Sequence, residues 1–176
     1  MLNRFKHISP VYRFVFLFAL LSICWYLLYN FLLKPYTGLD MAQVHITAAT
    51  TQWMLETLGH TTFVKGRELW IAGTSGLWIG DNCNAIPLFA LFSGFIISFP
   101  GNIKSKAWFI PLGIVLIFLF NCIRIALLAI SELHSRAWTE FNHTYTFTII
   151  IYGFIFLLWI YWVNRHSLLA KKKHVV

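Results

Sequence analysis

Four long apolar runs dominate the pattern of hydrophobic and polar positions along the chain. They cover about residues 14–33, 85–99, 107–130 and 147–163, and the connections between them carry most of the charged side chains. A helix needs roughly 20 apolar residues to cross the hydrocarbon core of a bilayer. We therefore expect each run to form a transmembrane helix, with the second run short for this length.

The longest connection, residues 34–82, has a pattern of its own. Apolar side chains recur at helical spacing from Met41 to Leu58, which predicts an amphipathic helix over about residues 39–58 that lies on the membrane. Two short strand-like segments, 61–64 and 68–71, then flank a Lys-Gly-Arg turn, and an extended piece follows at 77–79. We expect a small helix-and-hairpin cap outside the membrane.

Composition agrees with this class of protein. Of the 176 residues, 59% are hydrophobic and only 11% are charged, which is too little polar surface for a soluble globule of this size. The first run follows a basic start but has no small-residue cleavage site before Lys34, so we interpret it as an uncleaved helix. The sequence predicts an all-α integral membrane protein, with residues 1–176 forming a single polytopic domain.

The formal net charge of +8 is distributed in a way that predicts orientation. Nine Lys and Arg residues and no acid lie before the first run, between the second and third, and after the fourth, whereas all six acids lie in the other two connections. By the positive-inside rule, both termini are cytoplasmic and the cap lies outside the cytoplasmic (inner) membrane. The basic segments are therefore interpreted as topology signals, and no nucleic-acid partner is expected.

Helix rise brings three chemically capable side chains to the same end of the bundle. If the second and third helices begin at Phe99 and Trp108 on the inner side, Cys83 and Arg124 both lie roughly 24 Å further out, at about 1.5 Å per residue. By the same measure, His143 lies roughly 31 Å from the inner end of the fourth helix. The three side chains are expected near the outer membrane boundary.

Arg124 is the most informative of the three because it lies inside an apolar run. A charged side chain there costs at least about 2.5 kcal/mol on insertion scales, so it normally faces a protein or water-filled interior. Snorkelling to the headgroups, or a structural hydrogen-bond role, is the alternative. Asn121 shares the helical face of Arg124, whereas Cys122 lies about 200° around the helix from it.

Cys83 and His143 are each ambiguous when considered alone. Cys83 could be a nucleophile near a helix start, or could form a disulfide with Cys122 in an oxidising compartment. His143 could be a surface histidine, and His134 is its main rival, although His134 is expected to lie well above Arg124. Spacing alone does not choose between these alternatives.

Three segments together resemble signature segments of the exosortase/archaeosortase family. They are Asn82-Cys83-Asn84-Ala85, Asn121-Cys122-Ile123-Arg124-Ile125 and Asn142-His143, and the resemblance covers about residues 60–165. It implies a membrane-embedded cysteine protease or transpeptidase that cleaves C-terminal sorting signals of exported proteins at the outer face of the membrane. Each such tail is PEP-CTERM-like, with a short motif, a transmembrane helix and a basic cluster.

The resemblance also implies roles for individual residues. Cys83 would be the nucleophile, His143 its acid/base and Arg124 the electrostatic stabiliser. The neighbouring amides would contact the substrate; these are Asn82, Asn84, Asn121 and Asn142. Many family members have about twice as many membrane helices, and many place Ser-Gly or Ala-Gly after the cysteine, so this chain resembles a compact version whose preferred tail motif is open.

A second class of function is a non-catalytic membrane scaffold, or a small carrier in which Arg124 holds an anion. Such a protein would tolerate replacement of Cys83. No segment has the ligand spacing of a metal site, and we expect no metal and no cofactor.

Overall fold

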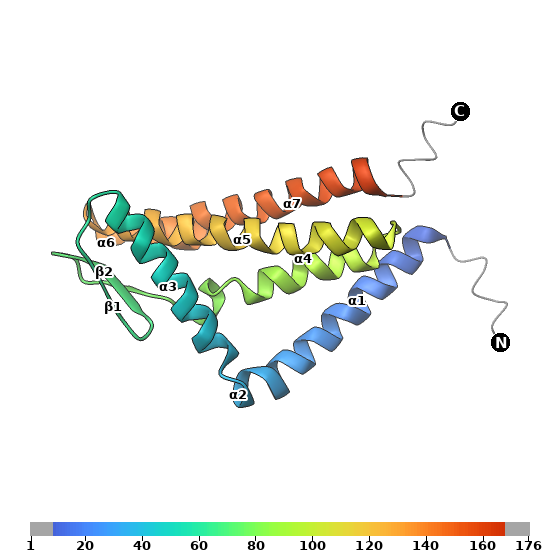
Figure 1. Ribbon diagram of the computed structural model, residues 1–176, viewed down its shortest axis with the longest axis horizontal. Helices are drawn as coiled ribbons and strands as arrows, with labels where there is room; N and C mark the ends of the chain where they lie inside the picture. Colours follow the sequence, from blue (N-terminus) through green and yellow to red (C-terminus); the bar gives the residue numbers. More distant parts are fainter. Residues whose placement is uncertain (1–8, 168–176) are drawn as a thin grey trace.

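Long helices, some parallel to the long axis and some oblique to it, give the molecule its elongated shape (Figure 1). The computed structural model describes residues 9–167, apart from the side chain of Asn82. The basic residues before position 9 and after position 167, which contribute to the predicted orientation, lie outside the described residues. The long helices are α1 (Pro10–Leu28), α3 (Leu39–Thr57), α4 (Ile86–Ser98), α5 (Ile103–Glu132) and α7 (Phe147–His166).

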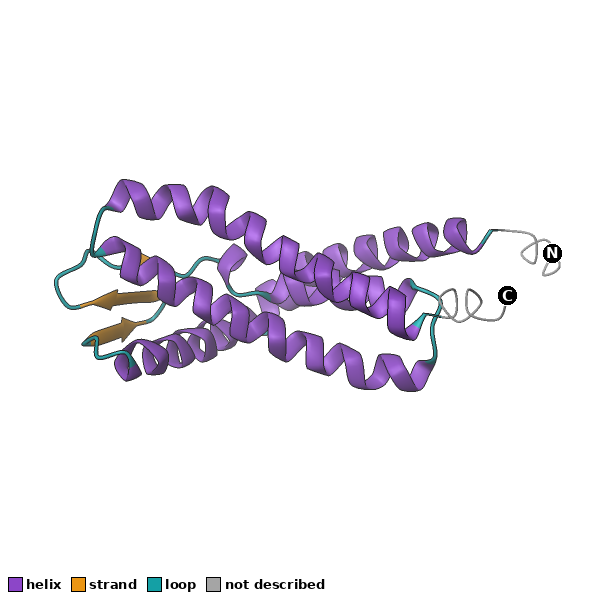
Figure 2. Ribbon diagram, turned by 90° about the horizontal axis from the view of Figure 1, so that it is seen from above, coloured by secondary structure: helices purple, strands orange, loops and turns teal. Residues whose placement is uncertain are grey.

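Shorter elements connect or extend these helices. A π-helical turn and the short helix α2 prolong α1, and α6 with a second π-helical turn leads into α7; their bounds are Tyr29–Leu33, Lys34–Tyr36, Arg136–Phe141 and Asn142–Thr146. The strands are β1 (Thr62–Lys65), β2 (Glu68–Ile71) and β3 (Leu77–Trp78). They gather at one end of the bundle (Figure 2).

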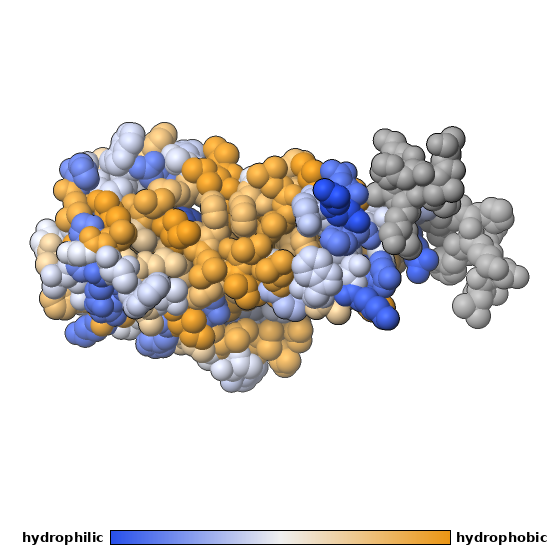
Figure 3. Space-filling view, turned by 45° about the horizontal axis from the view of Figure 1, so that its top comes forward, coloured by the Kyte–Doolittle hydropathy of each residue, from blue (hydrophilic) through white to orange (hydrophobic). Residues whose placement is uncertain are grey.

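Three helical segments are long and apolar enough to cross a membrane: Pro10–Tyr36, Ile103–Glu132 and Arg136–His166. The second apolar run forms α4, which has 13 residues and therefore spans about 20 Å, less than the roughly 30 Å of a bilayer core. The chain is an all-α membrane protein with a small cap, as predicted. Its surface has a broad apolar middle with hydrophilic patches towards both ends (Figure 3).

The cap contains the predicted helix and hairpin. β1 and β2 pair antiparallel with Lys65 opposite Glu68, and Gly66 adopts a positive φ of 61° in the tight turn between them. β3 adds to β2, which gives the sheet order β1-β2-β3. The hairpin therefore follows the turn chemistry that the sequence indicated.

The environment predicted for α3 was wrong. Val44, Ala48 and Leu55 are fully buried in a cluster that includes residues of β2 and α5, so the apolar face packs on protein and not on lipid. Met41 and Leu58, which we assigned to the same face, are exposed. Helical spacing identifies a face that is covered, but it does not identify what covers it.

A second core joins α4, α5 and α7 below the cap. Phe92 of α4 packs against α5 at Gly113, where an added Cβ atom would lie 2.1 Å from the Phe92 ring. Phe95 of α4 stacks on Trp159 of α7 with ring centroids 4.2 Å apart. These contacts hold the three helices close together.

Candidate active site

The segment before α4 makes a sharp turn that is buried inside the protein. Asp81–Cys83 forms a 3₁₀ turn, Ala85 adopts the left-handed conformation with φ 66°, and α4 begins at Ile86. That conformation costs a non-glycine residue roughly 1–2 kcal/mol. Irregular backbone at membrane depth is tolerated where protein buries it, and here Asn84 and Ala85 are fully buried.

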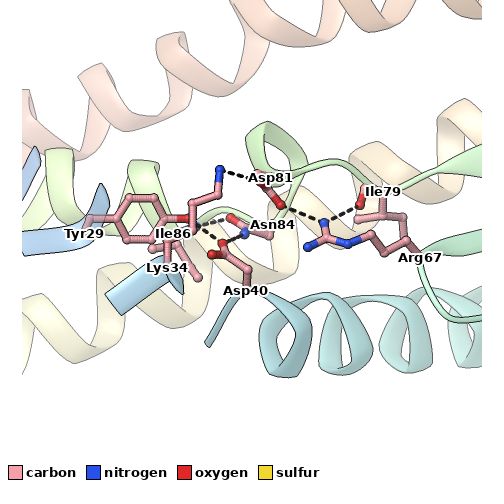
Figure 4. Close-up of polar contacts among 8 residues, drawn as sticks. All are labelled: Tyr29, Lys34, Asp40, Arg67, Ile79, Asp81, Asn84 and Ile86. Atoms are coloured by element: carbon pink, nitrogen blue, oxygen red, sulfur yellow. Dashed lines mark hydrogen bonds and ion pairs between the residues drawn. The ribbon is translucent and has the colours of Figure 1, made fainter. Parts of the chain in front are cut away.

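The side chain of Asn84 stabilises this turn through hydrogen bonds (Figure 4). Its Oδ1 accepts a hydrogen bond from the backbone N–H of Ile86, at 3.0 Å. Its Nδ2 donates to Oδ1 of Asp40, and the same carboxyl oxygen accepts the hydroxyl of Tyr29. Asp40 is 5% exposed and lies in the first turn of α3. One buried carboxyl group therefore ties the end of the first transmembrane segment and α3 to the turn that carries Cys83.

A second polar group fixes the start of the same turn (Figure 4). Asp81 pairs with Lys34, Nζ to Oδ2 2.8 Å, and with Arg67, Nη1 to Oδ1 2.7 Å. Arg67 also donates to the carbonyl oxygen of Ile79, at 3.3 Å. The hydrogen bond from Lys34, followed by that from Arg67, lowers the pKa of the Asp81 carboxyl below its ordinary value.

The backbone of Cys83 is also held from α5. Asn121 donates its side-chain amide to the carbonyl oxygen of Cys83, at 2.7 Å, and Asn121 is fully buried. Together with Asn84, this contact fixes the position of Cys83 from two sides. Cys83 is itself only 5% exposed.

His143 approaches Cys83 from the segment that joins α6 to α7. Its Nε2 lies 3.2 Å from the Cys83 Sγ, within hydrogen-bonding distance for sulfur. His143 lies in the π-helical turn Asn142–Thr146, and local distortions of this kind are frequent at functional sites. The carbonyl oxygen of His143 accepts a hydrogen bond from Thr148 at 3.2 Å. The residue is thus presented by a distorted turn that is continuous with α7.

Arg124 contributes a buried positive charge to the same place. It is 7% exposed, and its Nε has no hydrogen-bond partner within residues 9–167. An unpaired charged group in the interior is unfavourable, so such a group is normally retained for a ligand or a reacting group.

Cys122 points away from this site. It is fully buried and lies on the opposite face of α5 from Arg124, about 200° around the helix. All three cysteines of the chain are free thiols. The disulfide between Cys83 and Cys122, one of the alternatives left by the sequence, is not formed.

A cavity of about 460 Å³ joins the three functional groups. Residues of α4, α5 and α7 and of the turns before α4 and α7 form its walls: Cys83, Pro87, Leu88, Arg124, His143, Thr144, Thr148, Ile151 and Tyr152. The rival histidine, His134, lines a different hollow beside Trp138. The arrangement suits attack by a thiol, with a base beside the sulfur and a cation near the place where negative charge would develop.

The four predicted amide contacts do not line this cavity as a group. Asn84 and Asn121 are fully buried and bonded within the protein, and Asn142 is 9% exposed. The side chain of Asn82 lies outside the described part of the chain. Their contact with substrate stays a prediction. The structure adds Asp40 and Tyr29, which sequence reasoning missed because Asp40 was counted only as one of the outer acids.

Comparison with known proteins agrees with this geometry. The sequence model of the transmembrane exosortase family matches residues 9–163. The chain belongs to the transmembrane exosortase family. The match extends through the first transmembrane helix and α3, beyond the part that carried the resemblance in the sequence. No significant match was found among curated proteins or among solved structures.

Exosortases are in general membrane cysteine peptidases or transpeptidases that act on exported proteins with C-terminal sorting signals. Membership of the family therefore gives this exosortase a general role in membrane-associated protein sorting. Within residues 9–167, no group of three or more His, Cys, Asp and Glu side chains could hold a metal ion.

Proposed function

We propose that this exosortase is a cysteine transpeptidase or peptidase that cleaves the C-terminal sorting signals of exported proteins. The observation that carries the proposal is the 3.2 Å contact between Cys83 Sγ and His143 Nε2, with Arg124 lining the same cavity. A thiol beside an imidazole is the arrangement that activates a nucleophilic cysteine. Cys83 is the nucleophile, His143 the acid/base and Arg124 the electrostatic stabiliser.

The reaction proceeds in two halves. His143 Nε2 accepts the thiol proton, and the sulfur of Cys83 attacks the carbonyl carbon of the scissile peptide bond. The protonated imidazole then donates that proton to the departing amine as the C–N bond breaks. The product of this half-reaction is a thioester between Cys83 and the upstream part of the substrate. An amine or hydroxyl acceptor gives transfer, and water gives hydrolysis.

Arg124 stabilises the oxygen on which negative charge develops during the attack. Its Nε has no hydrogen-bond partner within residues 9–167 and the side chain already lines the cavity, so little reorganisation is needed when the charge forms. Asn121 and Asn84 position the nucleophile, because their side chains form hydrogen bonds with the backbone of Cys83 and Ile86. This positioning role explains why the two buried amides lie next to Cys83 without lining the cavity.

The proposed orientation places both termini in the cytoplasm and the site near the outer face of the cytoplasmic membrane. It rests on the distribution of Lys and Arg along the chain. The apolar part of the cavity is lined by Leu88 of α4 and Ile151 of α7, among others, and in this orientation we expect it to face the membrane. The membrane helix of a sorting signal would approach from that side, with its scissile bond near Cys83.

Processing of a tail-bearing reporter tests the proposal. The full-length protein and the variants Cys83→Ala, His143→Gln and Cys122→Ala are expressed with the reporter, and the release of its tail is followed. We expect release with the wild type and with Cys122→Ala, and loss with Cys83→Ala and His143→Gln. Hydroxylamine should release the reporter from wild-type enzyme trapped as the thioester.

A membrane-impermeant thiol reagent tests the orientation in the same cells, with Cys24 and Cys122 replaced. Labelling of Cys83 from outside supports it, and labelling only from the cytoplasmic side contradicts it. Unchanged processing by Cys83→Ala would exclude the cysteine mechanism and favour the scaffold or anion-binding carrier.

A further inference from the structure

His143 lies between two cavities, and only one of them contains Cys83. The second has a volume of about 370 Å³ and lies towards the cap. Its lining consists of Gly76, Leu77, Trp78, Glu132, Arg136, Thr139, Glu140, His143 and Thr144. His143 and Thr144 line both cavities, so the two are adjacent across the proposed acid/base.

One side of this second cavity is formed by consecutive residues of β3 and the residue before it. Gly76, Leu77 and Trp78 all contribute, so the cavity runs along the strand and not only against one side chain. β3 is at the edge of the sheet, because within the described residues the strand order ends with it. An edge strand presents backbone groups that can pair with another extended chain.

The register shows which backbone groups of β3 point away from β2. Trp78 lies opposite Glu68 in the pairing of β3 with β2. The next residue, Ile79, donates its N–H to the carbonyl oxygen of Arg67 at 2.8 Å. In an antiparallel pair, residues that bond to the partner alternate with residues whose N–H and C=O point away. The backbone N–H and C=O of Trp78 are therefore directed away from β2, and its side chain is 62% exposed.

The charged groups around the cavity are already engaged. Glu132 accepts a hydrogen bond from Ser75 at 2.7 Å, and Glu140 pairs with Arg136 at 3.5 Å. The groups that remain include a strand edge, an exposed indole, His143 and the hydroxyl of Thr144. These suit the repeating amides of an extended polypeptide better than a small charged molecule.

We propose that the extended segment of the sorting signal on the N-terminal side of the scissile bond binds in this cavity as an additional strand on β3. This inference rests on the proposed function. The exported part of a substrate lies outside the membrane, on the side of the cap, whereas its helix approaches through the apolar cavity. The chain between them must pass His143, and β3 lies along that path. The indole of Trp78 forms a cross-strand contact with a substrate side chain.

Backbone methylation of the substrate tests the pairing with the native enzyme. Full-length protein in lipid nanodiscs is given a series of tail substrates, each N-methylated at one successive residue upstream of the scissile bond. Strand pairing predicts that KM rises at alternate positions, because every second N–H points towards β3. A uniform effect, or none, would overturn the proposal.

The Trp78→Ala variant tests the protein side, with Phe63→Ala as a matched control. Phe63 is an exposed aromatic residue on β1, at the far edge of the same sheet. We expect Trp78→Ala to raise KM about tenfold, as loss of an aromatic anchor commonly does, and Phe63→Ala to leave it unchanged. The rate of Cys83 alkylation by iodoacetamide should be the same in both variants.

Equal KM values in the two variants would contradict the β3 subsite while wild-type processing continued. Failure of the proposed function has a different signature. In that case the wild type itself would not release the tail, or Cys83→Ala would release it equally well, and both proposals would be rejected.

Discussion

The side-chain amide of Asn121 lies 2.7 Å from the carbonyl oxygen of Cys83, so α5 fixes the backbone of the proposed nucleophile three residues before it presents Arg124. One turn of helix thus sets the position of the thiol relative to the cation. The relative placement of these two groups depends on a helix interior, which is more rigid than a loop.

Replacing Asn121 with Leu should therefore impair the reaction more than the fold. It leaves the buried Cys83 carbonyl without a donor, which costs about 1–3 kcal/mol of stability. We expect kcat to fall at least tenfold, measured by tail release. Asn102→Ala is the control, because Asn102 caps α5 by accepting the Lys104 N–H at 3.0 Å and its loss costs about 1 kcal/mol. Equal loss of kcat in the two variants would contradict the positioning role.

Asp40→Ala should weaken the turn that carries Cys83. It removes the acceptor shared by Tyr29 and Asn84, which leaves both buried donors unpaired. We expect lower thermal stability and slower alkylation of Cys83, with a smaller effect for Tyr29→Phe, which removes a single hydrogen bond worth about 1 kcal/mol.

Thr47→Val is the matched control for Asp40→Ala. Thr47 is buried on the same helix, and its hydroxyl has no hydrogen-bond partner within residues 9–167. The variant should leave the alkylation rate of Cys83 unchanged. If Asp40→Ala left that rate unchanged too, the buried carboxyl group would have no role in positioning the thiol.

Arg124→Gln should slow formation of the thioester by about 10²–10³-fold, the usual effect of removing one oxyanion-stabilising group. Arg124→Lys keeps the charge but loses the planar fork, so an intermediate rate is expected. Single-turnover accumulation of the thioester measures this step directly. His134→Gln should have no effect, since His134 lines a separate hollow. If Arg124→Gln formed the thioester at the wild-type rate, Arg124 would have no role in the mechanism.

Asp81 should contribute stability that disappears in acid. Lys34, followed by Arg67, lowers the pKa of Asp81 in the folded protein, so the unfolded state takes up the proton first as the pH falls. The advantage of wild type over Asp81→Asn is therefore full above the ordinary carboxyl pKa of about 3.9 and is lost below it.

Because the Asp81 side chain is 33% exposed, the advantage should be about 1 kcal/mol or less. Thermal melts from pH 7 to pH 3 measure it. Glu140→Gln should show almost none at any pH, since Arg136 and Glu140 are both 73% exposed. A constant difference between wild type and Asp81→Asn down to pH 3 would contradict the linkage.

Gly113→Ala should disturb the contact between α4 and α5. The new methyl group would lie 2.1 Å from the buried Phe92 ring, which has to move. Overpacking of this kind costs about 1–3 kcal/mol. Gly153→Ala is the control, because a Cβ atom there meets nothing within 4 Å. Thermal melts in detergent compare the two, and equal melting temperatures would show that Phe92 adapts freely.

The helices and the hairpin could be predicted because their causes are local. Apolar runs, helical spacing and the Lys-Gly-Arg turn depend on neighbouring residues, and each produced the expected element. The meeting of Cys83 with His143 was anticipated only as a similar height in the membrane. The lateral direction of each side chain depends on packing, which a single sequence does not specify.

The polar support of the site could not be predicted for a related reason. Asp40 looked like an outer acid because its partners, Tyr29 and Asn84, lie 11 and 44 residues away in sequence. The sequence also contained no sign of the π-helical turn that carries His143. Buried networks of this kind become visible only when distant segments have been placed together.

The shortness of α4 has a consequence for which proteins can be substrates. Since α4 spans about 20 Å, the turn with Cys83 lies within the thickness of the bilayer in the proposed orientation and not in the aqueous space above it. A freely diffusing polypeptide does not enter that layer, whereas a chain anchored by its own helix is held there continuously. Under the proposed function, the bilayer would therefore prevent cleavage of exported proteins that have no membrane anchor, whatever short motif they contain.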